Sequence, residues 1–316
     1  MKFYAAKHKD NVVLEMSSSG GAFTAISDYI LKEGGIIVAP TYDYSTNKLK
    51  YTIAHTTEER DLMRGSKYVQ VEPIDFLNDL VPISYTKKIL YIGTPCNIAS
   101  ASRYFTIKKA NIENIFLIDI ICHGVPSNKV WSDYLTERRI NTVNRLEFKD
   151  KRYGWKKPYA YVQDKNGQRS IDDYVSIFYS TNVLRPSCGV CKFASTKRES
   201  DLTIGDFWGI EKEYPDMYDN KGVSLLIVST EKGEKLFNEF KKDLNYIETD
   251  KEKSLQHNLI SPTIISEKRD EFWNEYKKRG LIKASRKMFL DSDVRRFLRR
   301  AKFMIKWRLK NAKRTK

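Results

Sequence analysis

The sequence predicts a mixed α/β fold, with parallel strand–helix units, an antiparallel portion and a basic amphipathic helix at the C-terminus. Apolar runs at 88–93 and 115–121 are separated by a segment of helical spacing, which is the arrangement that a parallel pair of strands requires. Asn166-Gly167 between two strand-like stretches indicates a hairpin and therefore antiparallel strands. Basic and apolar residues recur at helical spacing over 293–310.

The N-terminal third of the chain is expected to form a helix and a strand between two loops of small residues. Apolar side chains recur at helical spacing after a Ser/Gly stretch, and a Gly pair ends this helix before a short β-branched run. A proline in the first turn indicates another helix before the parallel strands. The expected elements are loop 17–21, helix 22–31, strand 36–39, loop 65–70 and helix 73–81.

The remaining elements complete the predicted sheet and hairpin. Helix 97–105 follows the first parallel strand, and helix 128–139 follows the second, with Ser127 as its expected N-cap. The later expected elements are hairpin strands 159–163 and 169–171, helix 173–182, strands 202–206 and 223–228, and a helix from Glu231.

Length and charge indicate how the chain is organised. Its 316 residues are many for one core, and we divide them into an N-terminal region (1–82), a region with all the cysteines (83–245) and a helical basic tail (246–316). Hydrophobic residues make up 41% of the sequence, which excludes a disordered protein. The formal charge is +16, of which 283–316 carries +12. Because the rest of the chain is nearly balanced, the charge does not indicate a uniformly basic nucleic-acid surface.

The N-terminus shows no secretory signal, because residues 1–10 carry charges throughout and have no apolar centre. The longest apolar stretch, 115–122, is interrupted by Asp119 and is too short to cross a bilayer. We therefore expect a cytoplasmic protein, in which thiols stay reduced. In that compartment four cysteines indicate metal or redox chemistry before disulfides.

The four cysteines are spaced so that they could form one site. Cys96 and Cys122 each follow a predicted strand, at the sheet edge where ligands bind in open α/β folds. Cys188 and Cys191 form a Cys-x-x-Cys pair, which is half of a zinc or iron–sulfur site. Four thiolates fit one [4Fe–4S] cluster or one structural zinc ion. The alternative is a zinc knuckle at Cys188 and Cys191, with the other two thiols merely buried.

Seven segments of the chain carry recognisable motifs. They are Ser17-Ser-Ser-Gly-Gly-Ala-Phe-Thr-Ala, Gly65-Ser-Lys-Tyr-Val-Gln, Gly93-Thr-Pro-Cys-Asn-Ile-Ala, Ile121-Cys-His-Gly-Val-Pro-Ser, Arg185-Pro-Ser-Cys-Gly-Val-Cys-Lys-Phe, Ser200-Asp-Leu-Thr-Ile-Gly-Asp-Phe-Trp-Gly and Lys221-Gly-Val-Ser-Leu-Leu-Ile-Val. In this order, between about residues 3 and 240, they resemble the coenzyme F420 hydrogenase/dehydrogenase beta-subunit family.

The resemblance implies an iron–sulfur flavoprotein oxidoreductase that passes electrons between a [4Fe–4S] cluster, FAD and a hydride carrier such as coenzyme F420. Cys96, Cys122, Cys188 and Cys191 would be the cluster ligands. Many relatives begin with a ferredoxin-like domain, and this chain starts after that point. Electrons are therefore expected from a separate ferredoxin, another electron-transfer protein or a reduced cofactor. Short members also resemble proteins of bacterial surface-polysaccharide clusters, which points to a role in polysaccharide biosynthesis.

The resemblance also implies which residues approach the flavin. They are Ser18, Ser19, Gly20, Gly21, Lys67 and Thr94. Backbone amides of a Ser/Gly loop ahead of a helix can receive phosphate or ring oxygens.

Four polar or aromatic side chains have two interpretations each. Lys67 would balance an anionic flavin, or be a solvated surface lysine. His123 would donate a hydrogen bond to the cluster or the flavin, or only within its own turn. Asp206 would orient a cofactor hydroxyl or cap the next turn. Trp208 is interpreted as core packing rather than as an electron relay.

The basic helix over 293–310 suits an anionic membrane surface, a partner protein or the protein's own core. It carries no base-reading signature, so specific nucleic-acid binding is not expected. The predicted location is thus the cytoplasm, with peripheral contact to the inner face of the cell membrane through this helix. A second functional hypothesis is a zinc-stabilised, non-catalytic scaffold that acts at the membrane surface.

Overall fold

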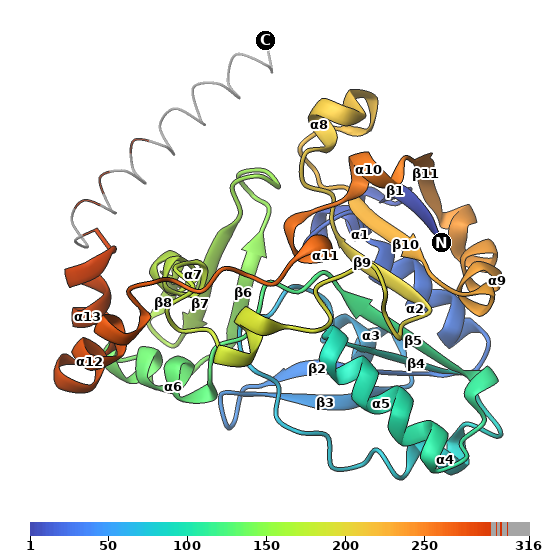
Figure 1. Ribbon diagram of the computed structural model, residues 1–316, viewed down its shortest axis with the longest axis horizontal. Helices are drawn as coiled ribbons and strands as arrows, with labels where there is room; N and C mark the ends of the chain where they lie inside the picture. The colour runs from blue at the N-terminus through green and yellow to red at the C-terminus, as the bar shows by residue number, and fades with distance from the viewer. Residues whose placement is uncertain (292–294, 296–297, 299–301, 303–316) are drawn as a thin grey trace.

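The structure is a computed structural model that describes residues 1–291 together with 295, 298 and 302 (Figure 1). The basic helix predicted over 293–310 therefore lies almost wholly outside the described residues. An eight-stranded mixed sheet and a three-stranded antiparallel sheet form the framework, which confirms the predicted mixed α/β class. The large sheet takes strands from both 1–82 and 83–245, and the division at these residues stays a prediction.

The large sheet has the strand order β11-β1-β10-β9-β5-β4-β2-β3. Its middle is parallel, because β2 pairs with β4, β4 with β5 and β5 with β9 in the same direction. The outer pairs are antiparallel. The strands are β1 (Lys2–His8), β2 (Ile36–Asp43), β3 (Lys48–Ala54), β4 (Ile89–Gly93), β5 (Ile115–Ile120), β9 (Leu202–Asp206), β10 (Ser224–Val228) and β11 (Leu244–Thr249).

Helices cover both faces of this sheet. One face packs under α2 and α9 in a core that includes Ile26 and Phe237, and the other packs under α5 in a core that includes Tyr91 and Phe105. The long helices are α2 (Ala22–Lys32), α5 (Pro95–Ile107) and α9 (Glu231–Phe240). The short ones are α1 (Asn11–Met16), α3 (Thr57–Asp61), α4 (Leu80–Ile83), α8 (Ile210–Glu213), α10 (Lys251–Ser254) and α11 (His257–Ile260).

The small sheet and its helices form a second lobe, at the left of Figure 1. Its core includes Trp131 and Tyr174, together with Phe272 from the C-terminal helices. The lobe consists of β6 (Arg145–Asp150), β7 (Tyr159–Asp164), β8 (Gly167–Ser170), α6 (Asn128–Glu137), α7 (Asp172–Tyr179), α12 (Arg269–Arg279) and α13 (Leu281–Met288). The hairpin predicted at Asn166-Gly167 is confirmed, since β7 and β8 pair across it. The 3-10 helices are η1 (Ile112–Asn114), η2 (Pro186–Val190), η3 (Pro215–Met217) and η4 (Lys241–Asp243).

Several local predictions are wrong. Residues 73–79 are not helical, and only Leu80–Ile83 forms a helix there, because the apolar side chains before it pack separately onto the core under α5. Ser127 is at the N-cap of α6 but makes no side-chain capping bond. The sequence patterns also gave no sign of β1, whose ends are charged and whose partners β10 and β11 lie more than 200 residues away.

No helix in the described part of the chain combines the length and the apolar character needed to cross a bilayer. The C-terminal helices instead pack on the small lobe, where the carboxylate of Glu137 caps the N-terminus of α13. Its two oxygens accept hydrogen bonds from the backbone N–H groups of Leu281 (2.6 Å) and Ile282 (2.8 Å). Gly280 has a φ of 86°, and a Cβ there would lie 2.7 Å from Oε1 of Glu137. The turn therefore depends on both residues.

We expect Glu137→Ala to lower the free energy of unfolding by about 1–2 kcal/mol, because two amide donors at the start of α13 lose their acceptor. Urea denaturation followed by circular dichroism measures the change. Glu239→Ala, at an exposed site near the end of α9, is the matched control and should change stability by less than about 0.5 kcal/mol. Equal losses in the two variants would contradict the capping role.

Candidate functional site

The cysteine-bearing loops meet at one edge of the large sheet. Cys96 lies in the first turn of α5, because this helix begins two residues earlier than predicted, and Cys122 follows β5. Since β4 and β5 are parallel neighbours, both residues lie at the ends of the strands on the same side. A backbone bridge between Pro126 and Leu184 brings the loop with Cys188 and Cys191 to this edge.

Close packing at Gly124 joins two of these loops. Its φ is 128°, and a Cβ there would lie 3.2 Å from Cβ of Cys188. Burial, together with the three other cysteine thiols, raises the pKa of the Cys122 thiol to about 12. All four cysteines are free of disulfides. Among the described residues, no group of three or more His, Cys, Asp or Glu side chains is arranged to hold a metal ion, so cluster ligation stays a prediction.

Two other predicted site residues lie beside the cysteines. Thr94 precedes α5, and its Oγ1 is 3.2 Å from Sγ of Cys96. The ring of His123 packs against Phe178 and Tyr179 of α7, with ring centroids 5.4 Å and 5.2 Å apart. Burial lowers the pKa of His123, and the nearby His257 lowers it further. His123 therefore connects the Cys122 loop with the small lobe.

The predicted Ser/Gly loop is held by hydrogen bonds within the protein. Ser18 Oγ accepts from the backbone N–H of Ser66 at 2.8 Å, so the two small-residue loops are in contact. Lys151, which the sequence analysis did not single out, donates from Nζ to the carbonyls of Leu14 (2.5 Å) and Ser19 (2.8 Å) and to a third at Lys221. Burial, together with the neighbouring Lys149 charge, lowers the pKa of Lys151 to about 8.

The two glycines of this loop meet backbone constraints. A Cβ at Gly20 would lie only 2.2 Å from the carbonyl oxygen of Ala6, and the Gly20 N–H donates to Ser224 Oγ at 3.0 Å. Gly20 thus lets the loop pack against β1 and β10. Gly21 is the N-cap of α2 and has a φ of 86°, a conformation that favours glycine.

Lys67 is half-buried rather than solvated. Its Nζ donates to the carbonyl oxygens of Met63 (2.7 Å), Arg64 (3.0 Å) and Gly65 (3.1 Å). Burial lowers the pKa of Lys67 to about 8, against the opposing effect of Glu147. No carboxylate within the described residues forms an ion pair with Lys67, so no carboxylate there neutralises its positive charge directly.

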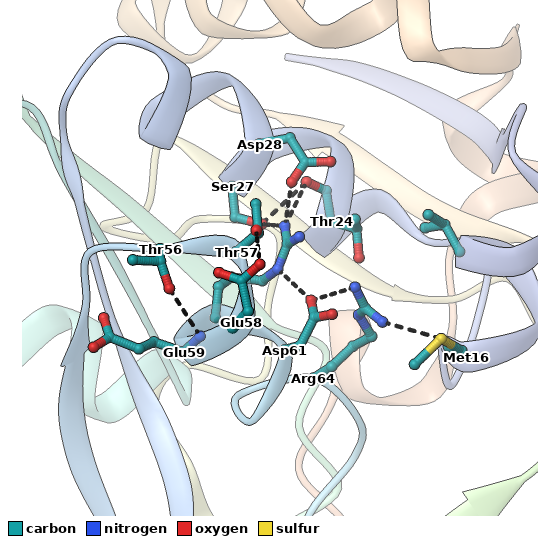
Figure 2. Close-up of polar contacts among 12 residues, drawn as sticks. Met16, Thr24, Ser27, Asp28, Thr56, Thr57, Glu58, Glu59, Asp61 and Arg64 are labelled. Atoms are coloured by element: carbon teal, nitrogen blue, oxygen red, sulfur yellow. Dashed lines mark hydrogen bonds and ion pairs between the residues drawn. The ribbon is translucent and has the colours of Figure 1, made fainter.

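A buried arginine, Arg60, stabilises the 63–67 turn, whose carbonyls accept hydrogen bonds from Lys67. The guanidinium of Arg60 is 3% exposed and pairs with Asp28 of α2 at 2.6 Å and with Asp61 at 2.8 Å. Asp61 also pairs with Arg64, whose Nη1 lies 3.6 Å from the sulfur of Met16 (Figure 2). This network joins α2, α3 and the end of α1, and so positions the 63–67 turn beside the Ser/Gly loop.

An aromatic cleft of about 490 Å³ opens between the small sheet, the 65–70 loop and the segment after β9. It is lined by Tyr68, Phe148, Lys149, Pro158, Ala160, Asp172, Val175, Tyr179 and Trp208. The hydroxyls of Tyr68 and Tyr179 are 3.1 Å apart. Because Tyr179 also contacts His123, the cleft is linked to the cysteine loops through two side chains.

Asp206 anchors a lysine at the wall of this cleft. Its Oδ2 pairs with Nζ of Lys149, and its Oδ1 accepts from Nε1 of Trp155 at 2.8 Å. Both oxygens of Asp206 are thus used within the protein. Trp208 stacks on Trp155, with ring centroids 4.8 Å apart, and is 44% exposed. The prediction that Trp208 packs in the core is therefore wrong: it forms a cleft wall.

Sequence reasoning missed the cleft and two of its lysine neighbours. Lys149 and Lys151 belong to the run Lys149-Asp-Lys-Arg152, which has the appearance of a solvated strand surface. Tyr68 did lie within a recognised motif, but nothing local showed that it faces α7. The available signal was the Trp208 indole just after a strand, since tryptophan is enriched at interfaces where one end of the side chain is apolar and the other is in water.

We expect Asp206→Asn to lower the free energy of unfolding by about 3 kcal/mol, because it leaves the Lys149 ammonium, 3% exposed, without its counter-charge. Asp206→Asn combined with Lys149→Met should recover part of this loss, since the lone buried charge is then gone. Thermal and urea denaturation measure both variants, with exposed Asp216→Asn as the control. A double variant as unstable as the single one would contradict the ion-pair explanation.

Two segments of the chain match the models of a known protein family. Residues 3–78 match the family described as coenzyme F420 hydrogenase/dehydrogenase, beta subunit N-term, and residues 86–254 match the C terminus of the same beta subunit. The chain is 23% identical over 250 residues to the F420-dependent formate dehydrogenase subunit beta of Methanocaldococcus jannaschii, and the match covers 77% of this chain. It spans 60% of the length of that relative.

A solved structure has a similar fold. A chain of the F420-reducing [NiFe] hydrogenase complex from Methanosarcina barkeri superposes with a TM-score of 0.56 at 17% sequence identity, over 91% of this chain and 90% of that one. The two family matches together cover most of the region that contains the cysteines, the two small-residue loops and the cleft. This chain belongs to the coenzyme F420 hydrogenase/dehydrogenase beta-subunit family.

Proposed function

We propose that the chain is an iron–sulfur flavoprotein oxidoreductase that relays electrons between a [4Fe–4S] cluster and a hydride-carrying cofactor or substrate. The observation that carries the proposal is the contact between His123 and Tyr179, which joins the cysteine loops to the aromatic cleft. A redox enzyme of this kind has to hold its one-electron centre and its planar hydride carrier close together.

The donor set fits an iron–sulfur cluster. Cys96, Cys122, Cys188 and Cys191 would hold it, because thiolates are the ligands of such clusters and the three other thiols lie close enough to Cys122 to raise its pKa. A cluster is larger than one ion, so its ligands lie farther apart than those of a single metal. When bound, the cluster would supply one-electron transfer. Thr94 and His123 would then adjoin its ligands.

The cleft and its lysines fit a flavin. Tyr68, Tyr179 and Trp208 line the cleft with aromatic rings suited to a planar cofactor, and Lys149 is held at the wall by Asp206. Lys67 and Lys151 donate to backbone carbonyls and form no ion pair among the described residues, so both cations favour an anionic cofactor group nearby. When bound, FAD would convert between a hydride pair and single electrons.

The relatives suggest the wider setting. Both carry F420 in their names, so a deazaflavin or another hydride carrier is the proposed two-electron partner. One relative is a subunit and the other belongs to a complex, which favours a ferredoxin or another electron-transfer protein as the one-electron partner. Service to surface-polysaccharide biosynthesis and a peripheral membrane position are proposals that rest on the sequence alone.

We expect anaerobically purified protein to be brown with flavin bands, and Cys188→Ser to lose the absorbance at about 400 nm, where thiolate–iron charge transfer occurs. Iron, sulfide and zinc analysis accompanies the spectra, and circular dichroism reports whether the variant folds. Ser187→Ala, next to the ligand, is the control and should keep the absorbance. Colourless protein with one zinc ion per chain would favour the scaffold hypothesis instead.

We expect Lys67→Met to weaken FAD binding several-fold below about pH 8, the pKa that burial gives this lysine. The Lys67 amine is charged below that pH and neutral above it. The difference in affinity between wild type and variant should therefore shrink as the pH rises through 8. Fluorescence titration of FAD across this range measures it.

Lys32→Met, at the exposed far end of α2, is the control for this series and should bind FAD like the wild type at every pH. A Lys67→Met defect that stays constant with pH would contradict the role of the Lys67 charge.

A further inference from the structure

A segment beyond the matched family region crosses the cysteine loops. Residues 261–268, called the crossing segment here, run between α11 and α12 from the large lobe to the small one (Figure 1). Thr263 Oγ1 donates to the carbonyl of His123. Ile265 packs against Gly189, where a Cβ would lie 2.5 Å from Cγ1 of Ile265. The crossing segment is therefore in direct contact with both the Cys122 and the Cys188–Cys191 loops.

Two large apolar side chains beside this contact face solvent. Val190, between Cys188 and Cys191, is 75% exposed, and Ile264 is 77% exposed. Each is the chain neighbour of a residue in the Gly189–Ile265 contact, so the two lie on the same part of the surface. Exposed apolar side chains grouped beside a functional site are typical of a binding surface.

The charge around these side chains is predominantly positive. The stretch 185–199 contains four basic residues and one acidic one, Glu199, and the crossing segment adds one residue of each sign, Glu267 and Lys268. Arg198 is buried and paired with Asp119. Lys192 and Lys197 are exposed, and neither forms an ion pair within the described part of the chain. An apolar centre with a rim of unpaired lysines is complementary to an acidic protein surface.

We propose that Val190, Lys192, Lys197 and Ile264 form a docking patch for a small acidic electron-carrier protein. The inference rests on the proposed function, because Val190 lies between two of the cluster ligands proposed above. In the transfer, the reduced centre of the carrier loses one electron and the cluster gains it, with no atom exchanged. Such encounters use small interfaces, and complementary charge mainly raises their association rate.

The test uses a small acidic [2Fe–2S] ferredoxin as the probe. The variant Lys192→Glu/Lys197→Glu should bind it with an association rate constant at least about ten-fold lower at low ionic strength, and the difference should shrink at high salt. A second variant, Val190→Ser/Ile264→Ser, should bind more weakly at all salt concentrations. Surface plasmon resonance measures binding, and stopped-flow absorbance measures reduction of the cluster by the reduced ferredoxin.

Lys235→Glu/Lys242→Glu, on α9 and the turn after it, makes the same change in net charge at a distant exposed site. It should bind like the wild type. Equal loss in the two charge variants, or no loss in either, would overturn the proposal. So would wild-type protein that ignores the ferredoxin but binds anionic phosphatidylserine vesicles through Lys192 and Lys197.

The readouts separate this inference from the proposed function. Reduction by dithionite and the cluster absorbance should be the same in the docking-patch variants as in wild type, which shows that only delivery is affected. Wild-type protein without iron and sulfide would refute the proposed function, whereas the ferredoxin binding assay would still report on the patch.

Discussion

β4 and β5 run in the same direction, with Ile89 opposite Ile115 and Gly93 opposite Asp119. Both strands are buried on their two faces, so the pairing is enforced by the two cores that the sheet separates. The loops with Cys96 and Cys122 consequently leave the sheet side by side. A slip of one residue would exchange the faces of one strand and move its cysteine loop along the edge. The common position of Cys96 and Cys122 at one edge of the sheet therefore depends on this register.

A buried ion pair then holds the segment after Cys191 at that edge of the sheet. Arg198 lies 3.3 Å from Asp119, both nearly inaccessible, and its guanidinium also donates to the carbonyls of Ile120 and Asn258. Burial raises the pKa of Asp119, while Arg198 opposes the rise. A buried pair of this kind adds little net stability but strongly penalises separation of its partners. It thus fixes the segment after Cys191 against β5 and α11.

The part of the site that follows from the sequence is the part that local pattern determines. Apolar runs define β4 and β5, and the cysteines come directly after them, so their common edge could be predicted. The cleft could not be, because its walls come from segments as distant as Tyr68, Lys149 and Trp208. Lys149 lies in a run of alternating charges that is typical of a solvated strand, and only the folded chain brings it to Asp206. The helix predicted over 73–81 is wrong at 73–79 for the same reason, since tertiary packing overrides its local signals.

The matched family region ends at residue 254, yet the site continues past it. Thr263 holds the carbonyl of His123, and His123 is the link between the cysteine loops and the cleft. The crossing segment is anchored at its far end, where Ser266 N donates to Thr181 Oγ1 at 2.9 Å. Because α12 and α13 complete the small-lobe core, they anchor the C-terminal end of the segment to that lobe. The ring of His123 contacts the cleft wall and its carbonyl contacts the crossing segment, so this one residue connects the cysteine loops both to the cleft and to the segment on which the proposed carrier would dock.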